Sequence, residues 1–242
     1  MIAALLALTL GQYTPQEAQA LFVEGNDAYY KGDYPTARGR YEKLLEAGLG
    51  GPDVLFNLGT THLAAGELGP AVLYLERARR ASGDDDIEAN LAVARQRQVD
   101  QVIGEDNAVP FTQRVAEIIN EPVVSVAFLV SVWLAFASFW FWRTREGSRV
   151  ISGLVTLALF AGCGTLGGAV GLHAWVRTHV VDAVMQAPTT KVLEFPGEAA
   201  KTTFEVHAGL KVRIMERSGK YVRLRLPNAL EGWAPQDSLV EI

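Results

Sequence analysis

The chain has 242 residues, of which 49% are apolar and only 20% are charged, and its formal net charge is −5. Because an ordinary soluble domain carries about 25% charged residues, this composition indicates that part of the chain does not lie in water. A single cysteine, Cys163, excludes a disulfide framework, and the acidic first half argues against a nucleic-acid partner, since phosphate binding needs a basic face.

The first segment, residues 1–11, begins with the apolar run MIAALLALTL. It is too short to span a bilayer and resembles the apolar region of a signal peptide, although the usual positive charges before that region are missing. We expect cleavage near Gly11. The alternative is a short apolar N-terminus that is retained.

Residues 12–104 contain an internal repeat. Six positions recur at one constant offset without a gap: Gly25, Gly32, Tyr34, Ala37, Tyr41 and Leu44 match Gly59, Gly66, Leu68, Ala71, Leu75 and Ala78. This pattern resembles the tetratricopeptide repeat, a pair of helices with a period of about 34 residues. The run Asp84–Asp86 supplies N-cap candidates for one further helix, which would close the apolar face of the second repeat. The region is therefore predicted to hold two repeats and a capping helix.

Helical repeats of this kind form a concave groove that binds a peptide or helix of a partner protein. The repeat register predicts that seven side chains face it: Phe22, Asn26, Tyr29, Tyr30, Phe56, Asn57 and Thr60. Asn26 and Asn57 match two asparagines of the family's carboxylate clamp, but Phe22 occupies the position of the clamp's lysine. The alternative is that both asparagines belong to the repeat consensus alone.

Residues 105–122 are interpreted as a linker. Within it Phe111, Val115, Ile118 and Ile119 share one helical face, which would lie on the bilayer surface or pack against the repeats.

Two uncharged runs follow, residues 123–142 and 150–175, each long enough for a transmembrane helix. The loop between them, residues 143–149, carries Arg143, Arg145 and Arg149. Short basic loops stay in the cytoplasm, so the sequence predicts a hairpin in the lipid bilayer with both flanking regions outside the cytoplasm.

Small residues are spaced for close helix packing within this hairpin. They are Ala127, Ser131 and Ala135 in the first run and Gly164 and Gly168 in the second. They would pack the two helices on each other or form a face for a partner's transmembrane helix.

After a linker over residues 176–189, the period of the apolar residues changes to two, which predicts about five short strands in a small barrel over 190–242. The residues Val206-His207, Gly209, Tyr221 and Gly232-Trp233 resemble the pattern of the bacterial SH3-like domain. In that family tryptophan is usual at the position of Tyr221, and related domains bind cell-wall peptides. Tyr221 and Trp233 are the candidate ligand contacts. The alternative is that Trp233 packs across the barrel and His207 hydrogen-bonds its own turn.

Together the segments predict a multidomain membrane protein with all-α repeats, a two-helix transmembrane hairpin and a small all-β SH3-like barrel. This order, with the string FNLGTTHLAAGELGPAVLYLERARRASGDDDIEANLAVARQ, resembles the BatE-type aerotolerance proteins. The resemblance implies a bacterial inner-membrane protein with its repeats and barrel in the periplasm. It also implies a complex with von Willebrand factor A-like Bat proteins, encoded beside a MoxR-type ATPase.

The sequence shows no constellation of catalytic residues, no metal-ligand spacing and no cofactor motif, so we expect a protein that is not an enzyme. Two functions remain open. One is a scaffold that binds partners in the repeat groove, and the other is a cell-wall sensor that binds peptidoglycan through the barrel.

Overall fold

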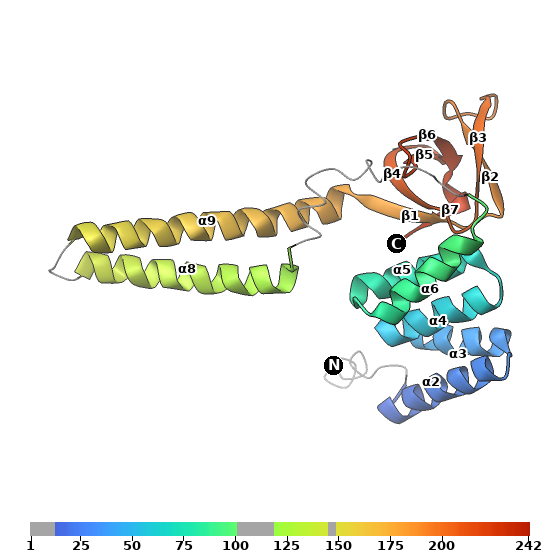
Figure 1. The fold of residues 1–242 in the computed structure, drawn as a ribbon, viewed down its shortest axis with the longest axis horizontal. Helices are drawn as coiled ribbons and strands as arrows, with labels where there is room; N and C mark the ends of the chain where they lie inside the picture. Colours follow the sequence, from blue (N-terminus) through green and yellow to red (C-terminus); the bar gives the residue numbers. More distant parts are fainter. Residues whose placement is uncertain (1–12, 101–118, 145–148) are drawn as a thin grey trace, which may run out of the picture. The chain divides into compact units, whose positions relative to one another are not determined.

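A computed structural model describes residues 13–100, 119–144 and 149–242 (Figure 1). The signal-like segment 1–11, most of the linker 105–122 and the centre of the loop 143–149 lie outside the described residues. The described residues up to 105 and from 181 onward form one compact unit, and those between 106 and 180 form a second.

The first half of the larger unit consists of consecutive helices. They are α2 (Pro15–Tyr30), α3 (Tyr34–Glu46), α4 (Pro52–Ala64), α5 (Leu68–Ala81) and α6 (Asp85–Arg97). Helix α2 begins with a capping box, in which Thr14 and Glu17 satisfy each other's backbone amides, and Asp33 and Asp84 cap α3 and α6. The predicted helical repeats and the additional helix after them are thus present.

Equivalent glycines set the spacing within each helix pair. A Cβ on Gly25 would lie 2.7 Å from the ring of Tyr41, and a Cβ on Gly59 would lie 2.8 Å from Cγ of Leu75. The turns after α2 and α4 pass through Gly32 and Gly66, both with positive φ angles. The constant offset in the sequence therefore arises because both repeats contain the same close helix contact and the same glycine turn.

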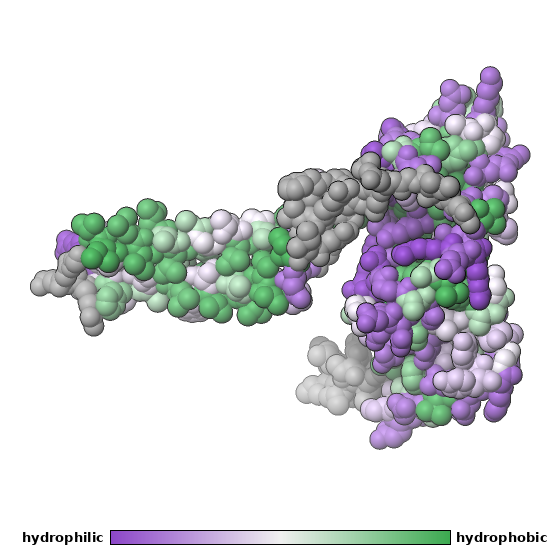
Figure 2. Space-filling view, in the orientation of Figure 1, coloured by the Kyte–Doolittle hydropathy of each residue, from purple (hydrophilic) through white to green (hydrophobic). Residues whose placement is uncertain are grey.

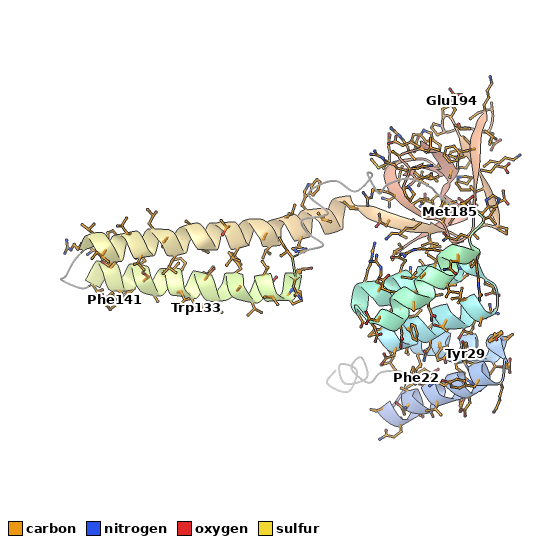
Figure 3. All side chains as sticks on the ribbon, in the orientation of Figure 1. Phe22, Tyr29, Trp133, Phe141, Met185 and Glu194 are labelled. Atoms are coloured by element: carbon orange, nitrogen blue, oxygen red, sulfur yellow. The ribbon has the colours of Figure 1, made fainter. Side chains whose placement is uncertain are left out.

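The smaller unit consists of α8 (Glu121–Thr144) and α9 (Arg149–His179), which pack along each other. By length and composition both are apolar enough to cross a membrane, and most of their apolar side chains are exposed. Figure 2 shows this apolar surface in green, and Trp133 and Phe141 of α8 are labelled in Figure 3.

The contact between α8 and α9 uses some of the predicted small residues and not others. Ala135 is fully buried in it, and Ala127 and Ser131 are half-buried. A Cβ on Gly164 or Gly168 would meet no atom within 4 Å, so these two glycines do not pack against α8. A hydrogen bond of 2.8 Å between the hydroxyl groups of Ser138 and Thr156 holds the pair elsewhere. The two predicted glycines therefore lie on a face that the hairpin leaves uncovered.

The rest of the chain forms one antiparallel sheet in the order β3-β2-β6-β5-β4-β1-β7, which we call the sheet domain (residues 181–242). Its strands are β1 (Val181–Met185), β2 (Thr189–Leu193), β3 (Thr202–His207), β4 (Lys211–Ser218), β5 (Tyr221–Arg225), β6 (Glu231–Pro235) and β7 (Leu239–Glu241).

The predicted boundaries of this region need correction. Residues 176–189, predicted as a linker, contain the end of α9 and all of β1, and seven strands replace the predicted five. Strand β1 is buried on both faces, so its sequence VDAVM lacks the alternation that reveals a half-exposed strand.

The sheet domain has its own core, to which Val212, Val222, Leu224 and Ala234 contribute. In β6 the small residues Gly232 and Ala234 face inward, which places Trp233 on the outer face. The interpretation that Trp233 packs across the core is therefore wrong, because the strand register gives that place to its neighbours.

Candidate partner-binding groove

The predicted groove residues lie on α2 and α4, the first helices of the two repeats. Two equivalent rows run across these helices and α6, and their members are spaced by one repeat period. One row is Phe22, Phe56 and Asn90, and the other begins with Asn26 and Thr60. The repeat geometry brings each row onto one side of the array.

A hydrogen-bonded pair links the first two repeats. Oδ1 of Asn26 accepts one hydrogen bond from the hydroxyl of Tyr41 at 2.7 Å and another from Nδ2 of Asn57 at 3.1 Å. Burial raises the pKa of Tyr41 to about 12, so this hydroxyl remains a donor at any physiological pH. These contacts use the oxygen of Asn26 and the nitrogen of Asn57. Within the part of the chain that the structure describes, the Asn26 amide nitrogen and the Asn57 amide oxygen remain as one donor and one acceptor for a ligand.

A second polar contact links the second repeat to α6. Nδ2 of Asn90 on α6 donates to Oγ1 of Thr60 on α4 at 2.8 Å. Sequence reasoning missed Asn90, although its position one repeat period after Phe56 carried the signal. The half-buried residues Asn26, Asn57, Thr60 and Asn90 together form what we call the polar ladder.

The aromatic groove candidates differ in how free they are. Phe22 packs edge-on against Tyr41 with 6.1 Å between ring centroids, and Phe56 packs against the core of the second repeat, so both stabilise the repeats. Tyr29 contacts Tyr30 and Tyr34 with its ring (Figure 3 labels Phe22 and Tyr29). Tyr30 remains 84% exposed, which makes it the aromatic side chain most available to a partner.

The two candidate contacts of the sheet domain lie on its outer face but in different surroundings. Tyr221 lines an open pocket of about 590 Å³ with Lys220, Pro235, Gln236 and Asp237. The Lys220 ammonium lies 5.9 Å from the centre of the Tyr221 ring. Trp233 does not line this pocket; it pairs with Arg223 on β5 and with Leu193 on β2.

His207 was expected to hydrogen-bond its own turn, and its carbonyl oxygen does accept a hydrogen bond from the amide of Leu210 there at 3.3 Å. Its ring, however, contacts another segment: Nδ1 lies 2.8 Å from Oδ1 of Asp100, beyond the end of α6. The sequence separation of the two residues hid this contact.

Among the described residues, no group of three or more histidine, cysteine, aspartate or glutamate side chains is arranged to hold a metal ion. The predicted groove residues include one hydrogen-bonded pair of amides, Asn26 and Asn57, and one strongly exposed aromatic ring, that of Tyr30.

Comparison with known protein families identifies the helical repeats. Residues 22–86 match the model of the family described as Tetratricopeptide repeat. A comparison with curated proteins gives no match. The helical half of the larger unit is thus built from tetratricopeptide repeats, a module that points to protein partners.

Proposed function

We propose that this protein is a non-enzymatic, membrane-anchored scaffold of a cell-envelope complex that binds partner proteins in its repeat groove. The observation that carries the proposal is the polar ladder. It presents an amide donor on Asn26 and an amide acceptor on Asn57, and Tyr30, four residues after Asn26 on α2, exposes its ring. A peptide backbone has the complementary groups, and tyrosine is enriched among residues that dominate binding energy.

The membrane anchor in this proposal is the pair α8 and α9, inserted in the bacterial inner membrane. The exposed apolar surfaces of both helices support this anchor. Arg143 near the end of α8 and Arg149 at the start of α9 support it as well, because they flank the short loop between the helices. Both flanks of the hairpin contribute to one compact unit, so they belong on the same side of a membrane that the hairpin crosses. The basic loop assigns that side to the periplasm. An exported N-terminus, with or without cleavage near Gly11, is part of the same proposal.

The family that best accounts for this order of parts is the BatE-type aerotolerance family. The sheet domain would then be its SH3-like barrel, and the partners would be von Willebrand factor A-like Bat proteins. The uncovered glycines Gly164 and Gly168 offer a second surface, for a transmembrane helix of such a partner.

The pocket beside Tyr221 favours a second candidate function, a cell-wall sensor. Its lining combines the Lys220 ammonium, the Asp237 carboxylate and an aromatic ring, groups that suit a peptide of peptidoglycan carrying both charges.

One experiment separates the two functions. The tagged full-length protein is captured from membranes in mild detergent, and the bound proteins are identified by mass spectrometry. The groove variant carries Tyr30→Ala and Asn57→Ala, and the matched sheet variant carries Tyr221→Ala and Lys220→Ala. We expect the groove variant to lose the partners that the wild-type protein and the sheet variant retain.

Loss of partners from the sheet variant alone would contradict the scaffold and favour the sensor. Reporter fusions near Asn107 and after Ile242 test the orientation, and both should report export. A cytoplasmic signal from either fusion would contradict the proposed topology.

A further inference from the structure

Strand β1 belongs to two cores at once. Ala183 and Met185 face the core of the sheet domain, whereas Val184 is fully buried among residues of the second repeat and α6, including Leu75 and Leu91. Figure 3 labels Met185 where the sheet meets the helices. A single valine thus contributes to the repeat core although both helices of the hairpin separate it from the repeats in the chain.

The first turn of α5 is shaped for this contact. A Cβ on Gly69 would lie 3.1 Å from the Cα of Gln186 and 3.1 Å from the carbonyl oxygen of Met185. Such distances are tighter than ordinary van der Waals contact, and the atoms concerned are mainly backbone. The equivalent position of the first repeat holds Pro35, so the repeat pattern does not require glycine here. The small residue serves the approach of β1.

Charged groups cross the same boundary. The carboxylate of Glu76 on α5 is 2% exposed and lies 3.2 Å from Nζ of Lys211 on β4. Asp182 on β1, also buried, lies 3.7 Å from Arg80 on α5 and 3.2 Å from Arg213 on β4. Each buried carboxylate therefore has a cation from the other half of the unit, and separating the halves would leave both partly unpaired.

The end of α6 is held as well. Asp100 accepts hydrogen bonds from the backbone amide and the ring of His207, and the side chain of Gln98 donates to the carbonyl oxygen of Gly209. The chain is thus bound to the sheet domain directly before it leaves for α8.

We infer that the outer face of α5 is a docking surface for the sheet domain of the same chain, and that α8 and α9 are an insertion into one folded unit. The two halves of that unit recognise each other without the covalent connection between them. In a longer repeat array a further helix would cover this face of α5; here β1 covers it and closes the array. The inference is independent of which partner the groove binds.

The test uses the full-length protein in detergent, with a site for a sequence-specific protease inserted between Asp100 and Glu121 and an affinity tag after Ile242. After cleavage, the tag captures the fragment with the hairpin and the sheet domain. We expect the repeat fragment to remain bound. Its release from the otherwise unchanged protein would overturn the inference.

Two variants show whether retention depends on the α5 surface. Gly69→Gln forces a side chain between α5 and β1 and should weaken retention about tenfold or more. Gly39→Gln is the matched control, since a Cβ there meets no atom within 4 Å and the position also lies within a helix. Circular dichroism of the released fragment verifies that its helices are intact.

From the sheet side, Val184→Asp should release the repeat fragment, and Phe195→Asp, at a residue that is 49% exposed, should not. Thermal unfolding of the uncut variants identifies loss of the sheet domain itself. Retention of the fragment in both Gly69→Gln and Val184→Asp would show that another surface holds the halves, and the inference would fail.

Discussion

The carboxylate of Asp100 receives two hydrogen bonds from His207, one from the backbone amide at 2.6 Å and one from the ring Nδ1 at 2.8 Å. The two residues are 107 positions apart in the chain, and both are partly buried. This contact fixes the end of the helical repeats to the turn between β3 and β4.

We predict that Asp100→Ala lowers the free energy of unfolding by about 1–3 kcal/mol, because it leaves two partly buried donors without their acceptor. Asp100→Asn should cost less, since an amide oxygen can still accept one of the bonds. Thermal unfolding of the full-length protein in detergent measures both. An Asp100→Ala protein as stable as the wild type would show that the contact does not form.

A second prediction concerns the tight helix crossing of the second repeat. Gly59→Ala places a methyl group 2.8 Å from Cγ and 2.9 Å from the backbone nitrogen of Leu75, so the helices must move apart. Overpacking of this kind costs about 1–3 kcal/mol. Ala71→Leu, at a residue that is completely buried between the same helices, should cost a similar amount.

Gly39→Ala is the control for that measurement. A methyl group there meets no atom within 4 Å, and alanine is a better helix former than glycine by about 0.5–1 kcal/mol. We therefore expect the melting temperature to rise for Gly39→Ala and to fall for Gly59→Ala. The opposite order would contradict the repeat register.

A third prediction is that acidification destabilises the repeats through His62. Burial lowers the pKa of this histidine from its ordinary value of 6.5, and the hydrogen bond to Glu67 only partly opposes the effect, with Arg38 and Glu42 also nearby. The unfolded chain then takes up the proton at a higher pH than the folded protein. The contribution of His62 to the free energy of unfolding is therefore fully present above pH 6.5. It is lost as the pH falls from 6.5 toward the lower pKa that this histidine has in the folded protein.

Carboxylates add to this loss at lower pH. Burial alone would raise the pKa of Glu76, but Lys211 and Arg79 outweigh it, and the net pKa lies below 4.5. Stability from this group is present above pH 4.5 and is lost as the pH falls further. Denaturant unfolding from pH 8 down to about pH 3 measures both effects. His62→Gln should flatten the curve below pH 6.5, and an unchanged slope there would contradict the assignment to His62.

A fourth prediction follows from the register of β6. Leu224 is completely buried in the core of the sheet domain, so Leu224→Ala should cost about 2–5 kcal/mol. Trp233 is larger but lies half-buried on the outer face, so Trp233→Ala should cost less than Leu224→Ala. Unfolding of the two variants by urea compares them. A larger loss for Trp233→Ala would mean that β6 is shifted by one residue.

The sequence was informative where a contact repeats and uninformative where it is unique. Gly25 and Gly59 could be recognised because the second helix of each repeat packs closely against the first at the same position of the repeat, where only a small residue fits. Asn90 could be reached by extending that period once more. Gly69 and Asp100 have no counterpart in the first repeat, so no pattern distinguished them from ordinary surface residues.

Strand β1 and the orientation of Trp233 were missed for a related reason. An alternating pattern of apolar residues reveals a strand only when one of its faces is exposed to solvent. Strand β1 is buried on both faces and follows directly after an apolar helix. In β6 the inward positions hold the small residues Gly232 and Ala234, which carry almost no apolar signal. The large ring of Trp233 between them was therefore the residue that the sequence pattern assigned to the core. In both cases the arrangement depends on neighbouring elements that a single strand does not encode.

Only Val180 separates α9 from β1, and its amide still bonds to the carbonyl oxygen of Val176 in the helix. Strand β1 itself is held on both edges, by β4 and by β7, and its Val184 is embedded among the helices of the repeats. To leave the sheet, the strand would have to break hydrogen bonds on both edges and withdraw a buried side chain in one event. Its loss would therefore open the sheet and the repeat core together.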